Sequence, residues 1–145
     1  YDQVMWMDAH EFKYIQEVGT MNLFFVFKDK IVTPATDGAI LKGITRDSFI
    51  HILRDWGYQV EERPISIDEV ASGYRKGELI EIFGSGTAAV ASQVCLLTYG
   101  DLDMTFDESN WEMSKKLKST LEHIRHGEEE DRFGWVVPIA HPVMA

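Results

Sequence analysis

The chain has 145 residues, of which 45% are hydrophobic and 26% are charged, and its formal net charge is −10. This length suits one domain over residues 1–145 with a sizeable buried core. The acidic balance excludes the basic face that nucleic-acid binding requires, and no apolar run reaches the roughly 18 residues of a membrane-spanning helix. We therefore expect neither a nucleic-acid partner nor membrane association.

Two features bear on the origin of the chain. The single cysteine, Cys95, cannot form an internal disulfide, which indicates a reducing compartment and predicts a cytoplasmic location. The sequence starts at Tyr1 rather than Met and soon enters the apolar run Val4-Met5-Trp6-Met7. This run predicts a buried strand, and we expect the chain to be a fragment of a longer protein.

The first third of the chain predicts a β-hairpin. Asn22–Phe27 is apolar and aromatic, Lys28-Asp29-Lys30 supplies a turn, and Ile31–Thr33 resumes the extended pattern. Pro34–Gly43 follows as a loop with two glycines.

A helix is predicted over Thr45–Trp56, and Gly57 ends it. Its apolar residues recur at i, i+3, i+4 and i+7 and form one stripe; they are Phe49, Ile52, Leu53 and Trp56. Gln59–Ile65 then alternates as a strand would.

Two further helices are predicted from capping boxes, in which a serine is followed three residues later by a glutamate. Ser66 and Glu69 open one helix, and Ser109 and Glu112 open the last, which Gly127 ends. Between these helices we expect a strand at Leu79–Phe83, a glycine-rich turn at Gly84–Thr87 and an extended stretch at Ala88–Leu97. This order of elements fits a mixed α/β or α+β domain.

Two segments could bind an anion. Gly43-Ile44-Thr45-Arg46 leads into a helix, whose first N–H groups and dipole attract negative charge; the alternative is a plain Thr45 N-cap behind a turn. Gly84-Ser85-Gly86-Thr87-Ala88 could form a nest of N–H groups; the alternative is a glycine-rich β-turn. The second segment lacks the lysine of a P-loop.

Glu17 lies between Ile15 and Val18, and a buried carboxylate there needs a cationic or hydrogen-bonding partner. The partner could be Arg46 or Arg63 in a structural ion pair, or it could be a cation on a ligand.

No metal site is expected. The five histidines show no ligand spacing, and the acidic run Glu128–Asp131 is typical of a solvated loop. The acidic residues near Asp101 lack the glycine and the final glutamate of a calcium loop.

Together these segments resemble the class IV, pyridoxal-phosphate-dependent aminotransferases. The spaced pattern of that class is matched by Glu17, Gly19, Asn22, Leu23, Phe24, Thr33, Leu41, Gly43, Ile44 and Arg46. Glu17–Asn22 and Phe83–Ala88 resemble the branched-chain amino acid aminotransferases more narrowly. The resemblance extends from Tyr1 to about Trp135.

The resemblance implies a fold and a cofactor. The fold would be α+β, the large C-terminal domain of fold type IV, with a mixed or antiparallel sheet or pseudo-barrel packed by about three helices. The cofactor would be pyridoxal 5'-phosphate, with Glu17 facing the pyridine nitrogen, Leu41 packed on the ring, and Ile44 and Thr45 holding the phosphate. Thr87 would lie near the phosphate and, with the N–H of Ala88, would receive the substrate carboxylate.

The remaining residues of the pattern are expected to support the site. Thr20 would lie near Glu17, and Asn22, Gly43, Arg46 and Gly86 would hold the loops in place. The reaction implied is amino transfer between leucine, isoleucine or valine and 2-oxoglutarate, in a parent protein that is a homodimer.

Three departures from the family pattern limit what the chain can do. Lys42 replaces a usual proline, and Ala89 and Ser92 replace the redox cysteine pair of the animal enzymes. The Schiff-base lysine and the small N-terminal domain of the family lie upstream of the segment that matches Tyr1. No catalytic residue is therefore expected in this chain, and cofactor binding by the chain alone is expected to be weak, in the millimolar range at best.

Two other functions stay open at this point. The isolated chain could be a catalytically inactive domain or binding module, or the protein could be related to D-amino acid aminotransferases or aminodeoxychorismate lyases.

Overall fold

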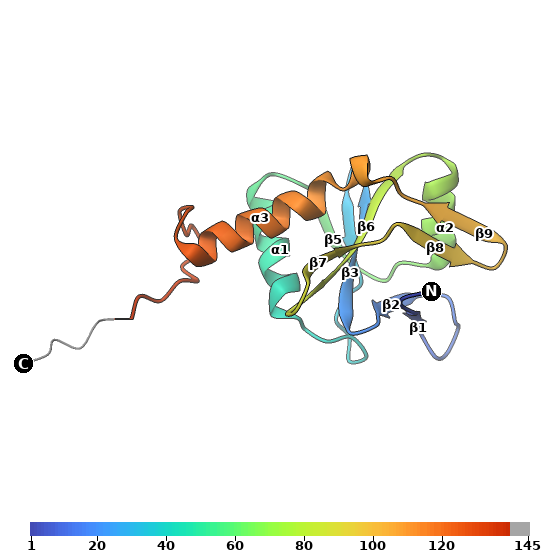
Figure 1. Cartoon of the computed structure of the whole chain (residues 1–145). Helices are drawn as coiled ribbons and strands as arrows, with labels where there is room; N and C mark the ends of the chain where they lie inside the picture. The colour runs from blue at the N-terminus through green and yellow to red at the C-terminus, as the bar shows by residue number, and fades with distance from the viewer. Residues whose placement is uncertain (140–145) are drawn as a thin grey trace, which may run out of the picture.

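The computed structural model describes residues 1–139. It contains a mixed seven-stranded sheet, a two-stranded sheet and three α-helices (Figure 1). The larger sheet consists of β1 (Met5–Met7), β2 (Ile15–Val18), β3 (Met21–Phe27), β4 (Ile31–Thr33), β5 (Val60–Glu62), β6 (Leu79–Gly86) and β7 (Val90–Gln93). The smaller sheet is a hairpin of β8 (Leu96–Tyr99) and β9 (Leu102–Thr105), and the helices are α1 (Ile44–Asp55), α2 (Ile67–Arg75) and α3 (Glu112–His126).

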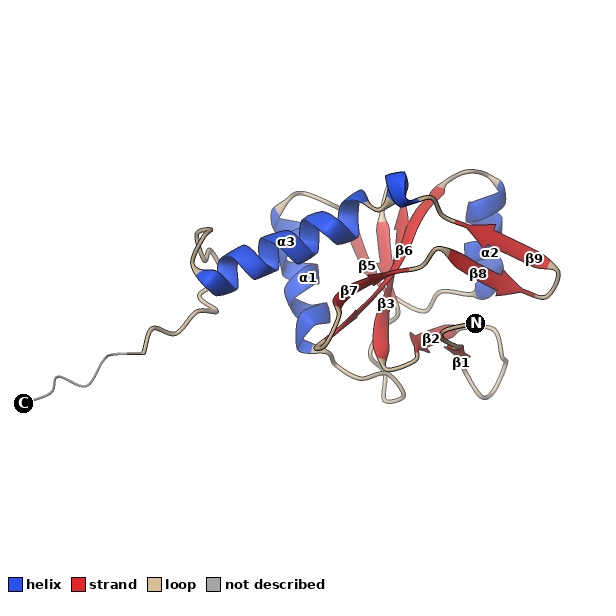
Figure 2. Ribbon diagram, viewed as in Figure 1, coloured by secondary structure: helices blue, strands red, loops and turns tan. Residues whose placement is uncertain are grey.

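Strand β3 organises the larger sheet. β6 pairs with β3 along one edge, while β2 and β4 share the other edge, and β7 extends the sheet beyond β6 (Figure 2). All of these pairs are antiparallel, and the pair of β4 with β5 is parallel. The predicted α+β class with about three helices and a mixed sheet is confirmed.

Both faces of β3 are buried, which explains its continuous apolar sequence. Phe24 and Val26 face a cluster that includes residues of α1 and α3, whereas Leu23, Phe25 and Phe27 face a second cluster that includes residues of α2 and β9. The sheet therefore separates two cores, with α1 and α3 on one face and α2 with the β8–β9 hairpin on the other (Figure 1).

The predicted helices α1 and α2 are both present, but the capping box of α2 forms only in part. The predicted stripe of α1 is buried at Phe49, Ile52 and Leu53. At α2, the Ser66 hydroxyl accepts the Glu69 N–H at 3.1 Å. The Glu69 carboxylate does not complete the capping box, because it pairs with Arg63 instead.

The capping box predicted for α3 is wrong. Asp107 accepts the N–H of Ser109 and begins a short 3-10 turn (Glu108–Asn110), and α3 itself begins at Glu112. The N–H groups of Met113 and Ser114 donate to the Glu81 carboxylate at 3.0 and 3.1 Å. The cap of α3 thus comes from β6, which no local pattern could reveal.

Glu81 belongs to β6, and its side chain is fully buried against the start of α3. Burial raises the pKa of this carboxyl, and the hydrogen bonds from Ser114 and Met113 act in the opposite direction. The predicted end of α3 at Gly127 is confirmed, because this glycine has a left-handed φ of 72°.

Several strand boundaries differ from the prediction. Gly84–Gly86 continues β6 rather than forming a turn, and the reversal comes at residues 87–89. Both glycines lie close to Met21, which a side chain at either position would crowd. The strand predicted over Gln59–Ile65 is limited to β5, and the β8–β9 hairpin was not predicted. No helix within residues 1–139 is long and apolar enough to cross a membrane.

Candidate functional site

Glu17 and Asn22 form one end of the candidate site. They lie opposite each other on β2 and β3, and the Glu17 carboxylate oxygen Oε1 accepts the backbone N–H of Leu41 at 2.9 Å. The Asn22 amide donates to Oε1 at 3.4 Å and to the Leu41 carbonyl at 2.8 Å. Glu17 and Asn22 therefore fix the position of Leu41, whose side chain is 70% exposed.

The structural ion pair considered for Glu17 is absent. Arg46 donates to the Pro34 carbonyl and to Glu62, and Arg63 pairs with Glu61 and Glu69. Within residues 1–139, Oε2 of Glu17 has no hydrogen-bond partner, and no cation pairs with this half-buried carboxylate. An acceptor is thus available for a cationic or N–H group of a ligand.

Gly43 lies between Asn22 and the first turn of α1. A Cβ atom at this position would clash with the Asn22 side-chain oxygen Oδ1. Because Asn22 is itself held by its bonds to Glu17 and Leu41, the close approach requires glycine here. The glycine of the predicted anion segment therefore has a steric reason in the structure.

The start of α1 presents free donors. Its N-cap is Gly43, which has no side-chain cap, and this excludes the alternative of a plain Thr45 N-cap. Within the part of the chain that the structure describes, the N–H groups of Ile44 and Thr45 have no hydrogen-bond partner. A helix start with unpaired N–H groups and a positive dipole end can bind an anion such as a phosphate.

Thr45 joins the start of α1 to the end of β6. Its hydroxyl lies 3.5 Å from the Gly86 carbonyl, to which it donates, and Gly86 leads directly into the exposed residues Thr87 and Ala88. The N–H groups of Thr87 and Ala88 also lack a backbone partner among residues 1–139. Two segments about 40 residues apart in the sequence thus place unpaired N–H donors at one end of the sheet.

The remaining predicted residues take these positions. Arg46 is buried and connects α1 to Pro34 and Glu62, and Thr20 is exposed in the turn between β2 and β3. Lys42 is exposed beside Gly43 and lines an open groove of about 360 Å³ at the start of α1. Sequence reasoning missed that Asn22 bridges Glu17 and Leu41, because no local pattern reports a contact across 19 residues.

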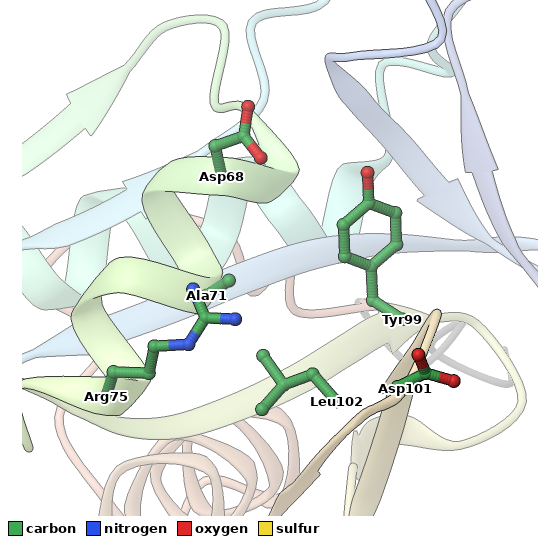
Figure 3. A pocket seen from close by; sticks show the side chains of 6 residues that line it. All are labelled: Asp68, Ala71, Arg75, Tyr99, Asp101 and Leu102. Atoms are coloured by element: carbon green, nitrogen blue, oxygen red, sulfur yellow. The ribbon is translucent and has the colours of Figure 1, made fainter.

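A separate groove lies outside this site. It has a volume of about 310 Å³ and lies between α2, which contributes Asp68 and Arg75, and the hairpin, which contributes Tyr99, Asp101 and Leu102 (Figure 3). None of the predicted site residues lines it. No cluster of metal-ligating side chains occurs within residues 1–139.

The arrangement fits a cofactor with a basic ring nitrogen and a phosphate. A carboxylate oxygen is free at one end, unpaired N–H donors lie at the other, and the exposed Leu41 side chain lies between them in the chain. The cradle at Gly43 would be filled by any larger residue. These features support the predicted roles of Glu17, Leu41, Ile44 and Thr45, which stay predictions.

Comparisons with known proteins agree with this geometry. Residues 1–97 match the family model "Amino-transferase class IV". The chain is 50% identical to the "Probable branched-chain-amino-acid aminotransferase" of Staphylococcus epidermidis over 140 residues, which cover 96% of this chain and 39% of that protein.

Solved structures share the fold. The branched-chain amino acid aminotransferase of Escherichia coli superposes with a TM-score of 0.74 and 30% identity, over 93% of this chain and 42% of that one. A Brucella abortus aminotransferase bound to the co-factor PLP has a TM-score of 0.65 and 23% identity over 83% of this chain and 39% of that one, and shows the fold alone. The chain spans about two fifths of the length of these proteins, and it belongs to the class IV aminotransferase family.

Proposed function

We propose that the chain is the C-terminal large part, residues 1–145, of a pyridoxal-phosphate-dependent branched-chain amino acid aminotransferase. The observation that carries this proposal is the uncapped start of α1, held by Gly43 and Asn22 beside the free oxygen of Glu17. The identity of 50% to a relative with that name favours the branched-chain substrates over those of D-amino acid aminotransferases and aminodeoxychorismate lyases.

Bound pyridoxal phosphate supplies an electron sink for amino transfer. The residues of this chain would hold it at both ends. The N–H groups of Ile44 and Thr45 would donate to the phosphate, and Leu41 would pack against the ring. The Thr45 hydroxyl would also donate to the phosphate, in place of its 3.5 Å hydrogen bond to the Gly86 carbonyl. The Glu17 carboxylate would hold a proton at the pyridine nitrogen, because a nearby anion favours the charged form of a basic group.

The turn after β6 would bind the substrate. The N–H groups of Thr87 and Ala88 would donate to its carboxylate, and the Thr87 hydroxyl would also lie near the phosphate. The substrates would be amino acids and 2-oxo acids.

In the complete protein, a lysine in a preceding segment would carry the cofactor and move the proton. The complete protein would be a cytoplasmic homodimer. The cytoplasmic location is supported by the single, unpaired cysteine.

The chain alone would bind the cofactor weakly. A charge-assisted hydrogen bond at Glu17 contributes about 1.5–3 kcal/mol and two neutral bonds at the phosphate about 1 kcal/mol each, while the helix dipole adds about 0.3–1 kcal/mol. The sum, about 4–6 kcal/mol before ordering costs, is below the roughly 8 kcal/mol of micromolar binding. We expect millimolar affinity, and a micromolar affinity in an absorbance titration would contradict this estimate.

The test compares the protein made from the complete coding sequence with this chain, using transamination from leucine to 2-oxoglutarate. We expect activity in the complete protein and none in the chain, whose residues provide binding and orientation without the lysine. Activity of the chain alone would refute this division of roles, and an inactive complete protein would favour the second candidate, a binding module. The high exposure of Leu41 and Ile44 suits a face that another part of the protein covers.

A further inference from the structure

Val90, the first residue of β7, has an unusual backbone conformation. Its φ is 59°, in the left-handed region, where a β-branched residue is a genuine outlier. Among residues 1–139 only one other non-glycine residue, Phe12, has a positive φ. Backbone strain of this kind persists only where the surrounding structure holds it, and it concentrates at functional sites.

The structure shows what holds Val90. Its side chain is 9% exposed and belongs to the core cluster between the sheet and helices α1 and α3. The N–H of Ala91 donates to the Ala89 carbonyl at 2.6 Å, which closes a tight three-residue turn centred on Val90. Burial of the side chain and this hydrogen bond fix the backbone in the strained conformation.

The strained turn borders the segment with unpaired N–H groups. Val90 is the cross-strand partner of Gly86, and the Gly86 carbonyl accepts a hydrogen bond from the Thr45 hydroxyl. Thr87, Ala88 and Ala89 lie between the two partners and are exposed. The left-handed conformation of Val90 is therefore part of the reversal after β6, and it lies two residues from Ala88.

We propose that Val90 is a positioning residue, which orients the N–H groups of Thr87 and Ala88 toward the carboxylate of the amino acid or 2-oxo acid substrate. This inference rests on the proposed function and adds a residue to it that touches neither substrate nor cofactor. Val90 acts through its buried side chain, which prevents the turn from relaxing to an unstrained backbone. The sequence offers no signal for this role, since valine is disfavoured in a left-handed conformation.

The test is the substitution Val90→Gly, which removes the buried side chain and frees the backbone. In the complete enzyme we expect the KM for leucine to rise about tenfold, because the substrate would then have to order the turn when it binds. We expect kcat to change by less than about threefold. Val90→Ile keeps a β-branched, buried side chain, and its KM should stay within about twofold of the wild-type value. An unchanged KM for Val90→Gly would overturn the inference.

Val26→Ala is the matched control. Val26 is a valine of the same core cluster, also largely buried, on β3 and away from the turn. We expect Val26→Ala to lower the melting temperature with KM unchanged, whereas Val90→Gly raises KM. A rise in KM for both variants would show a general loss of packing and would overturn the specific role of Val90.

A second measurement does not depend on activity. In the chain alone, amide NMR should show lower order parameters at Thr87 and Ala88 in Val90→Gly than in the wild type, and weaker shifts of these amides on titration with 4-methyl-2-oxopentanoate. If the wild-type amides of Thr87 and Ala88 do not respond to this carboxylate, the inference fails. Shifts of Ile44 and Thr45 on titration with pyridoxal phosphate test the proposed function separately.

Discussion

The three α-helices within residues 1–139 begin in different ways. α2 is capped by the Ser66 hydroxyl and α3 by the buried carboxylate of Glu81, whereas α1 has a glycine N-cap and no side-chain cap. Free N–H groups at a helix start are costly unless they find a partner. The chain satisfies this requirement at α2 and α3 with its own residues and leaves α1 open, which is the arrangement expected where a ligand anion provides the cap.

The largest effect is expected from removing the cap of α3. Glu81→Ala leaves the N–H groups of Met113 and Ser114 buried without an acceptor, which should lower the free energy of unfolding by about 2–4 kcal/mol. Urea denaturation measures this, and Glu78→Ala, at an exposed glutamate just before β6, serves as the control with an effect within about 0.5 kcal/mol. Equal stability of Glu81→Ala and wild type would show that α3 needs no cap.

Adding a side chain at Gly43, the N-cap of α1, should affect both the stability of the fold and the binding of pyridoxal phosphate. Gly43→Ala forces Asn22 away from Gly43 and disturbs its bonds to Leu41 and Glu17, so we expect a loss of about 1–3 kcal/mol of stability and about tenfold weaker binding of pyridoxal phosphate. Thr36→Ala, on the wall of the same open groove, is the control. Wild-type binding by Gly43→Ala would contradict the assigned geometry.

Glu17→Gln separates charge from structure. Glutamine keeps an acceptor for the N–H of Leu41, so stability should change by less than about 0.5 kcal/mol. The charge-assisted bond to the ring nitrogen is lost, which should weaken the binding of pyridoxal phosphate about tenfold, or about 1.4 kcal/mol. Binding of inorganic phosphate should not change, and a loss there would place Glu17 at the wrong end of the site.

The cap of α2 should contribute less than that of α3, because it involves one neutral hydroxyl at a partly exposed position. Ser66→Ala is expected to cost about 1 kcal/mol of unfolding free energy, and Ser66→Asp should restore it. A cost as large as that of Glu81→Ala would remove the distinction between the two caps.

The smallest effect is a pH dependence of stability. Burial raises the pKa of Glu81 in the folded chain, so the folded state binds more protons than the unfolded state between the ordinary carboxyl pKa and the raised one. The free energy of unfolding should therefore fall as the pH rises through this window. Glu81→Gln should have a flatter profile in denaturation measured across the same pH range, and an identical slope in both proteins would assign the dependence to other groups.

The sequence predicted what depends on local pattern. The stripe of α1, the ends of helices at Gly57 and Gly127 and the hairpin of β3 and β4 follow from periodicity and glycine positions. The prediction of the α3 cap failed because Glu81 lies more than 30 residues away in the sequence from the N–H groups that donate to it. A serine and a glutamate with capping-box spacing gave a plausible local alternative at Ser109, which the structure does not use.

The site was predicted to a similar extent. The sequence singled out Glu17 and Gly43, and the structure places both against Asn22. It joins Thr45 to Gly86 of the glycine-rich segment. The roles of these residues at a cofactor stay predictions. The prediction of a turn at the glycine-rich segment was wrong, because Gly84 and Gly86 belong to β6. A Cβ atom at either position would lie 3.2 Å from the Met21 side chain, so both glycines allow a close approach of Met21. Close packing between distant segments is not visible in a single sequence.

Amide NMR of the chain during titration with pyridoxal phosphate is the sharpest check on the open start of α1. We expect the N–H resonances of Ile44 and Thr45 at the start of α1 to shift with a common millimolar dissociation constant. Those of Glu69, Met113 and Ser114, at the two capped helix starts, should remain in place. No shift at Ile44 and Thr45, or equal shifts at all three helix starts, would contradict the claim that α1 alone is held open for an anion.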